Sequence, residues 1–300
     1  MSLVVRTASP ADLERLVPQL DQQFVFSRGR CVSLAQRFPA VYSAENCVNV
    51  FLLADDDQVM SALACKHFDW VCSGGHWRGA MIGAVHTQTE LRGHGFASRL
   101  MEEVAERLRA GGVEFAVLWT AVPAFYARLG WISADRGVLG KIGQTQIPTA
   151  PPDGVIKMPL DAADLSHIER IRQRWCDCRA PRRADDYRQL PLPAESVDLI
   201  MWGDGIDYAG YALVGNAGET GILYEMIGHP DAFPVLWPDI CRGYRQLLAN
   251  DTTDSASYRW LCQGTGLVWS TKPLATWLPL SATVTVEHAA RWYIPYFDRI

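Results

Sequence analysis

The chain carries few charges of either sign, and no stretch of it is strongly basic. Charged residues make up 20% of its 300 residues, and the formal net charge is -5. The densest basic spot, Arg179, Arg182 and Arg183, is followed at once by Asp185 and Asp186, which is more typical of a solvated helix entrance than of a nucleic-acid surface. No apolar run approaches the roughly 20 residues that span a bilayer, and the start lacks a secretory signal. We therefore expect no nucleic-acid partner, no membrane partner and a cytoplasmic location.

Metal-binding cysteine pairs are also missing, although the chain has eight cysteines. Cys176 and Cys178 form a C-x-C sequence, but no second pair and no histidine cluster lie near them. Because a structural zinc site needs four such ligands, we expect no metal. In a long chain without a secretory signal, we expect the cysteines to be reduced, mostly buried thiols.

The hydrophobic content, 49%, is enough for a sizeable core, and the length favours two domains. A strand pattern at 4–6 followed by Ala-Asp-Leu at 11–13 has a weak counterpart at 155–157 and 163–165. A second counterpart pairs 50–53 and 61–63 with 197–201 and 211–213. Prolines 148, 151 and 152 indicate a linker between the copies. We therefore expect two copies of one α/β fold, over residues 1–147 and 155–300; chance similarity of short apolar patterns is the alternative.

Hydrophobic periodicity predicts the individual elements. Strands are expected over 3–8, 48–54, 59–68, 81–87 and 115–119. Helices are expected from Pro10, with Ser9 as the N-cap, and over about 33–42, 95–110, 124–129 and 235–249.

The segment from Val85 to Leu100 bears most directly on chemistry. A strand enters a tight turn, and the turn opens an amphipathic helix. The first N–H groups of a helix have no partner in the chain and carry partial positive charge, so they can hold a pyrophosphate. Gly93 and Gly95 let the backbone approach closely, and Arg92 adds a positive charge.

Two better-known glycine-rich loops are excluded. A P-loop needs Gly-Lys-Ser/Thr, which does not occur in the chain. The dinucleotide fingerprint needs a third glycine where Ser98 stands, and it opens on the first strand of its domain rather than the fourth.

The turn matches Arg/Gln-x-x-Gly-x-Gly/Ala at Arg92, Gly95 and Ala97, and in this it resembles the coenzyme A motif of the GCN5-related N-acetyltransferases (the GNAT superfamily). About thirty residues later, Phe125 to Trp131 resembles the family's Phe-Tyr-x-x-x-Gly-Phe, with Trp131 in the last position. The resemblance covers residues 3–145 well and 155–280 only as an echo of the fold. It implies two tandem GNAT-like domains, each a mixed, mostly antiparallel twisted sheet flanked by helices.

The resemblance also implies an activity, the transfer of an acetyl group from the co-substrate acetyl-CoA to a primary amine by direct attack. Tyr126 would be the general acid that protonates the departing thiolate, and the backbone N–H of Val85 would bind the thioester oxygen. The implied coenzyme contacts are the backbones of Val85, His86 and Thr87 for the pantetheine arm, Arg92, Gly93, His94, Gly95, Phe96, Ala97 and Ser98 for the pyrophosphate, and the backbones of Ala121 and Val122, where the family often has an Asn.

The general base is not identified by the sequence. His86 alternates with Val85 and faces either the cleft or the core. Glu90 is more typical of an exposed loop carboxylate, and His94 is expected to face solvent. Many enzymes of the family deprotonate the amine through water, so that no single base is needed.

The second half lacks the glycine-rich turn. At the corresponding place it has His229-Pro230-Asp231, with neither glycine nor arginine, so we expect no coenzyme there and expect this half to wall the acceptor cleft. The layout resembles the enhanced-intracellular-survival type of acetyltransferase, with an active first copy and a degenerate second one, but leaves no room for that group's sterol-carrier-like domain. In that group the terminal carboxylate can reach the active site, and Ile300 doing so is a hypothesis. The aromatic segment 292–297 is expected to be docked on the protein.

Two alternatives stay open: a non-catalytic coenzyme A-binding, scaffold or sensor protein, and an acyltransferase directed at thiols or hydroxyls. The acceptor, a small-molecule or peptide amine, is not identified. We expect its contacts in the loops between residues 22 and 42, although Phe24, Phe26, Phe38 and Tyr42 are more typical of core. The sequence also leaves open the acyl-chain length and whether the protein forms a homo-oligomer.

Overall fold

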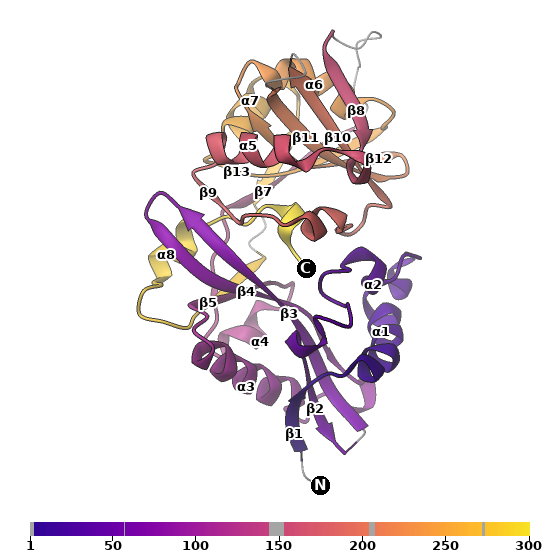
Figure 1. Cartoon of the computed structure of the whole chain (residues 1–300), viewed down its shortest axis with the longest axis vertical. Helices are drawn as coiled ribbons and strands as arrows, with labels where there is room; N and C mark the ends of the chain where they lie inside the picture. The colour runs from indigo at the N-terminus through magenta and orange to yellow at the C-terminus, as the bar shows by residue number, and fades with distance from the viewer. Residues whose placement is uncertain (1–2, 57, 144–152, 204–207, 272–273) are drawn as a thin grey trace. The chain divides into compact units, whose positions relative to one another are not determined.

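The computed structural model describes residues 3–56, 58–143, 153–203, 208–271 and 274–300. The chain forms two compact units (Figure 1). The first contains Met1–Asp135, Leu274–Trp292 and Ile300, and the second contains Arg136–Pro273 and Tyr293–Arg299.

A mixed sheet forms the centre of the first unit. Its strands run in the order β1 (Leu3–Thr7), β2 (Val50–Asp55), β3 (Gln58–Cys72), β4 (Gly75–Thr87), β5 (Phe115–Trp119), β15 (Ala275–Pro279) and β6 (Ile132–Ser133). Only the β4–β5 pair among these is parallel.

Helices cover both faces of this sheet, because successive strand residues point to opposite sides. Val50 and Leu52 pack with α1 (Pro10–Phe24) and α2 (Leu34–Arg37). Phe51 and Leu53 pack with α3 (Phe96–Ala110) and α4 (Pro123–Ala127). Figure 1 shows α1 and α3 on opposite sides of the strands.

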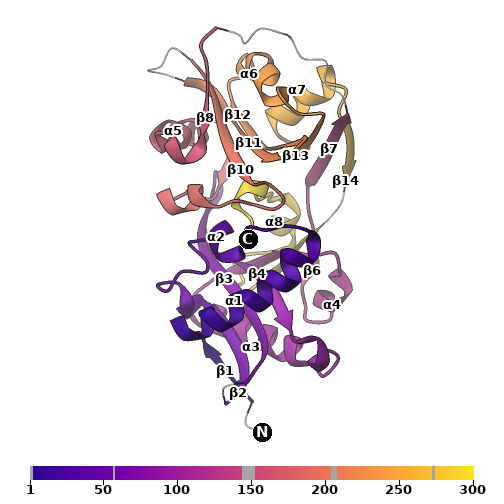
Figure 2. The same cartoon turned by 90° about the vertical axis from the view of Figure 1, so that its right-hand side faces the viewer.

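The second unit repeats the arrangement. Its strands run in the order β8 (Val155–Pro159), β10 (Ser196–Gly203), β11 (Tyr208–Ala217), β12 (Thr220–Gly228), β13 (Gln246–Thr252), β7 (Gly137–Gly143) and β14 (Val268–Thr271). Here β12 and β13 form the parallel pair. One face carries α5 (Leu165–Trp175), and the other carries α6 (Ala232–Cys241) and α7 (Ala256–Gly264), as Figure 2 shows. The prediction of two α/β copies is confirmed.

The remaining elements are short. They are β9 (Cys178–Arg179), α8 (Val286–Arg291) and the single-turn 3₁₀ segments Phe26–Arg28, Cys47–Asn49, Thr89–Leu91, Leu160–Ala162, Ala184–Arg188 and Tyr296–Asp298.

The bounds of the two units differ from the predicted 1–147 and 155–300. Each sheet contains a strand from the other half of the sequence: β7 pairs with β13, and β15 pairs with β5. A short apolar run shows that a strand forms but not which sheet it joins, so the exchange leaves no signal in the sequence. The three linker prolines fall in 144–152, outside the described residues.

Two helix predictions need correction. The helix expected over 33–42 is confined to Leu34–Arg37. The helix expected to run to residue 249 ends at Cys241, and Gln246–Ala249 belongs to β13. Gly243 adopts a left-handed φ of 87°, a conformation that terminates helices, and buried Leu247 and Ala249 then alternate as strand residues do.

The cysteines also differ in part from expectation. Cys72 and Cys178 are disulfide-bonded, so the expectation of eight reduced thiols is wrong for these two, because sequence spacing does not show which cysteines meet in space. Within the described residues, no group of three or more His, Cys, Asp or Glu side chains is placed to hold a metal ion. No helix in that part of the chain is long and apolar enough to cross a membrane.

The aromatic segment near the end of the chain is docked, as predicted. Trp292 is 4% exposed and packs on Trp70, Trp77 and Trp277 of the first unit. Phe297 is fully buried in the core of the second unit.

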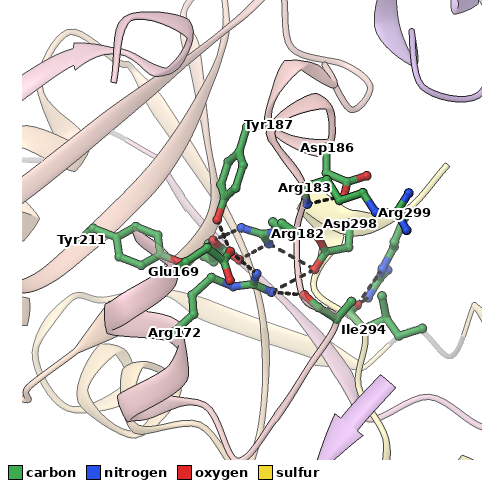
Figure 3. A network of polar contacts seen from close by, with 12 residues as sticks. Glu169, Arg172, Arg182, Arg183, Asp186, Tyr187, Tyr211, Ile294, Asp298 and Arg299 are labelled. Carbon is green, nitrogen blue, oxygen red and sulfur yellow. Dashed lines mark hydrogen bonds and ion pairs between the residues drawn. The ribbon is translucent and has the colours of Figure 1, made fainter. Parts of the chain in front are cut away.

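A buried charge network lies within the second unit (Figure 3), and the Arg182 guanidinium carbon is 4.8 Å from the ring centroid of Phe297. Both terminal nitrogens of Arg182 donate to the carboxylate of Glu225 at 2.7 Å, and its Nε donates to Asp298 at 2.6 Å. Arg172 extends the network, with 3.7 Å between its Nη2 and Asp298. The interpretation of the basic spot as a solvated helix entrance is therefore wrong for Arg182, whose side chain is 1% exposed. Its partners come from distant parts of the sequence, which local charge spacing does not show.

Candidate active site

Strand β4 separates from β5 part-way along its length. The two strands pair from Gly79 to Met81, whereas β4 stays paired with β3 as far as Thr87. At the separation Ala84 has a φ of 48°, and the β3–β4 register shifts between Ala62 and Ala64. A left-handed non-glycine residue costs about 1–3 kcal/mol and occurs mainly at functional sites. Beyond the bulge, the backbone of β4 on its β5 side is available to a ligand.

Val85 and His86 point to opposite faces of the sheet. Val85 packs with the α3 cluster. The His86 ring points toward α1, where its Nδ1 lies 2.7 Å from Gln23 Oε1. His86 is 7% exposed. The sequence left open which way this side chain faces, and in the structure it is buried on the α1 face of the sheet.

The N-terminus of α3 is an open set of donors. Its first helical bond runs from Arg99 N–H to the Gly95 carbonyl at 3.0 Å, so the N–H groups of Phe96, Ala97 and Ser98 have no partner within the helix. Gly95, the N-cap, has a φ of 80° and caps with no side chain. A Cβ atom at Gly93 or Gly95 would meet nothing within 4 Å. The turn therefore offers free N–H groups with space in front of them, as a bound pyrophosphate requires.

Arg92 and His94 lie in this turn and are exposed. Arg92 Nη2 donates to Gln23 Oε1 at 3.0 Å and its Nε to the Thr87 carbonyl at 3.2 Å, which holds the guanidinium beside the end of β4. The His94 ring stacks on Phe96, with 5.9 Å between ring centroids.

Tyr126 lies on α4 in the same cluster as Val85 and Phe96. It is 7% exposed and packs edge-on against Phe125 and Trp131. Burial raises the pKa of its phenol to about 12, so the hydroxyl carries its proton at neutral pH. The hydroxyl has no hydrogen-bond partner among the described residues and is free to donate.

Ala121 and Val122 are exposed on the loop after β5. The N–H of Val122 donates to Thr120 Oγ1 at 3.0 Å, and its carbonyl accepts from Phe125 N–H at 3.1 Å. The backbone of Val122 is therefore already engaged, and of the two residues Ala121 is the better placed to contact a ligand.

In the second unit, the corresponding donors at the start of α6 are already engaged. At the start of α6, Ala232 N–H donates to the His229 carbonyl at 2.9 Å and Phe233 N–H to the Pro230 carbonyl at 3.2 Å. Pro234 has no N–H. A Cβ atom at Gly228 would lie 2.3 Å from the Gly210 backbone, so the end of β12 is packed closely against β11.

One feature of the first site has no counterpart in the sequence analysis. Gln23 joins His86 to Arg92 across more than sixty residues, and no local pattern marks it. Ile300, whose approach to the site is a hypothesis of the sequence analysis, lies against β4, because a Cβ atom at Gly83 would be 3.2 Å from its carboxylate carbon.

The geometry agrees with comparisons to known proteins. The family model described as Acetyltransferase (GNAT) domain matches residues 4–134. These residues form a GNAT acetyltransferase domain. No curated protein is significantly similar in sequence.

Solved structures extend the likeness over both units. A GCN5-related N-acetyltransferase from Anabaena variabilis is 15% identical, with a TM-score of 0.72 over 93% of this chain and 73% of that one. Eis1 from Mycobacterium abscessus is 12% identical, with a TM-score of 0.62 over 92% and 74%. A tandem GNAT protein from the clavulanic acid biosynthesis pathway is 12% identical, with a TM-score of 0.54 over 93% and 99%. These likenesses establish two tandem GNAT-like domains as the fold.

Proposed function

We propose that this protein is an N-acetyltransferase that moves an acetyl group from acetyl-CoA to a primary amine. The observation that carries the proposal is the conjunction, in one unit, of the open donor set at the start of α3, the separation of β4 from β5, and a protonated Tyr126 in the cluster that also holds Val85 and Phe96. The second unit, with its donors already satisfied, is not expected to bind the coenzyme.

Each group has a role in direct transfer. The pyrophosphate is held by the N–H groups of residues 96–98 and by Arg92, and the pantetheine arm follows β4. The amine nitrogen attacks the thioester carbon, and the Val85 N–H stabilises the developing oxyanion. As the C–N bond forms and the C–S bond breaks, Tyr126 gives its proton to the departing thiolate.

Calorimetric titration of acetyl-CoA into the wild type and Gly95→Trp tests the donor site. We expect the wild type to bind at one site with about micromolar affinity and the variant to bind at least 10-fold more weakly, because the indole fills the space before the free N–H groups. Gly218→Trp is the matched control, since Gly218 also has a left-handed φ and open space around it but lies in the second unit. Loss of binding in both variants would indicate a general folding defect.

The catalytic part of the proposal has its own test. Thiol release from acetyl-CoA is followed across a panel of primary amines, with a thiol and an alcohol included. Acetylation of an amine supports the proposal; tight coenzyme binding without transfer to any amine would instead support a non-catalytic coenzyme A-binding protein.

The location of the protein and its partners stay predictions. A cytoplasmic location is the prediction from the sequence. The oxidation state of Cys72 and Cys178, which are disulfide-bonded, tests it, because disulfides persist mainly in oxidising compartments. Counting the free thiols of protein freshly isolated with and without reductant shows whether these two cysteines are oxidised.

A further inference from the structure

One oxygen atom joins the phosphate-binding turn to the buried histidine of β4. Gln23 Oε1, on α1, lies 3.0 Å from Arg92 Nη2 and 2.7 Å from His86 Nδ1. An arginine side chain can only donate hydrogen bonds, so the Gln23 atom that faces Arg92 is the oxygen and not the amide nitrogen.

The shared oxygen fixes the tautomer of His86. Because an amide oxygen only accepts, His86 Nδ1 must carry the proton. In a neutral imidazole the other nitrogen, Nε2, then bears the lone pair. The orientation of the Gln23 amide and the form of the ring are thus determined together by Arg92.

His86 Nε2 is buried and has no hydrogen-bond partner among the described residues. A buried polar atom without a partner calls for an explanation, and the receipt of a ligand, a proton or a water is one. The backbone carbonyl of His86 accepts from Ser61 Oγ at 2.6 Å. The residue is therefore held at its backbone and at Nδ1, and Nε2 is the remaining polar atom of the ring.

The surroundings keep the ring neutral. Burial lowers the pKa of His86, and the Arg92 guanidinium lowers it further. Two other charged groups lie on segments packed against this part of β4. Asp21 of α1 accepts the Leu34 N–H at 2.6 Å, and the terminal carboxylate of Ile300 lies against Gly83. From β3 the neighbour is Ser61, which is uncharged.

We propose that His86 Nε2 is the general base that removes the proton from the acceptor amine, directly or through one water, and that Gln23 is the residue that positions it. This inference rests on the proposed acetyltransferase activity. As the amine nitrogen bonds to the acetyl carbon, its excess proton passes to Nε2, while the Tyr126 proton passes to the thiolate sulfur. The imidazolium and the phenolate then return to their starting forms by exchange with water.

The tautomer is tested without any acceptor. Long-range ¹H–¹⁵N correlation spectra of ¹⁵N-histidine-labelled protein, assigned with His86→Gln, distinguish the two neutral forms. We expect a protonated Nδ1 and a bare Nε2 in the wild type at pH 7.5, and a mixture of forms in Gln23→Leu. A wild-type ring protonated on Nε2 would overturn the inference whether or not the protein acetylates amines.

The roles of His86 and Gln23 are tested by kinetics with an amine that the wild type acetylates. We expect His86→Gln to lower kcat about 100-fold, because the base is removed. We expect Gln23→Leu to lower kcat about 10-fold, because the imidazole is kept but is no longer held in one tautomer. Acetyl-CoA affinity, measured by calorimetry, should change by less than about threefold in His86→Gln, whereas Gln23→Leu also releases Arg92 and should weaken coenzyme binding. His76→Gln, at the exposed end of the same strand, and Gln22→Leu, the exposed neighbour on α1, are the matched controls.

The variant Gln23→Glu should change the pH dependence of kcat, which would not change if Gln23 had a purely structural role. A carboxylate still accepts from Nδ1, so activity is retained, but its charge stabilises the imidazolium and raises the pKa of His86. Because the base acts only when unprotonated, the acid limb of the kcat profile should move to higher pH. An unchanged profile, or full activity in His86→Gln, would overturn the base assignment; absence of acetylation by the wild type would instead refute the proposed function.

Discussion

Tyr126→Phe will lower kcat about 100-fold while acetyl-CoA binds as it does to the wild type. The substitution removes only the hydroxyl, which makes no hydrogen bond to any described residue. The ring keeps its contacts with Phe125 and Trp131, so stability should be nearly unchanged. The expected loss is therefore in the step that expels the thiolate and not in coenzyme binding.

The measurement is kcat and KM for acetyl-CoA by thiol release, with unfolding followed in urea as the check on stability. Tyr208→Phe, in the second unit, is the matched control and should leave both constants unchanged. A loss below about threefold in Tyr126→Phe would show that the thiolate leaves without this proton, contrary to the proposal.

The raised pKa of Tyr126 also predicts a pH dependence. A general acid is active while protonated, and this phenol loses its proton only as the pH rises through about 12. Tyr126 should therefore produce no basic limb in the kcat profile between pH 7 and 9. A decline in that range that disappears in Tyr126→Phe would contradict the burial of the phenol.

The open set of N–H donors at the start of α3 was predictable because its chemistry is local. Free N–H groups, Gly93, Gly95 and Arg92 lie within seven residues, so the strand–turn–helix pattern contains the whole arrangement. The position of Tyr126 followed in the same way from one short motif. A local pattern could not identify partners that are distant in the sequence, and Gln23, the shared partner of His86 and Arg92, is the clearest example.

The weak repeat predicted the right fold, although the matching residues have different roles in the two copies. In the first copy Ser9 is the N-cap of α1, and Asp12 completes a capping box by accepting the Ser9 N–H at 2.9 Å. In the second copy Asp164 is itself the N-cap of α5. The shared Ala-Asp-Leu therefore marks a helix start in both halves, because several placements of an acidic or hydroxyl side chain satisfy a helix N-terminus.

Long-range pairing accounts for the other differences. The exchange of β7 and β15 and the burial of Arg182 both depend on which distant segments meet. Arg182 sits among charges of alternating sign in the sequence, a pattern that favours a solvated surface. Its partners Glu225 and Asp298 are 43 and 116 residues away, so the network could be found only in the folded chain.

Arg182→Met is expected to destabilise the protein by about 3–5 kcal/mol. The substitution leaves the carboxylates of Glu225 and Asp298 buried, 5% and 3% exposed, without the guanidinium that donates to them both. The hydroxyl of Tyr211 donates to Glu225 Oε1 at 2.7 Å, and Arg172 lies near Asp298, but neither replaces two bidentate contacts. Urea unfolding measures the loss, and hydrogen exchange in residues 208–228 locates it in the second unit.

A second variant separates the cost of an unpaired charge from the value of the pair. Arg182→Met combined with Glu225→Met removes one charge of each sign and leaves Asp298 with Arg172, so it should recover a large part of the lost stability. Arg245→Met is the control, because its ion pair with Glu219 is exposed and should contribute less than about 1 kcal/mol. If the double variant is as unstable as Arg182→Met, the network stabilises the fold by its own pairing, and the argument from uncompensated charge is wrong.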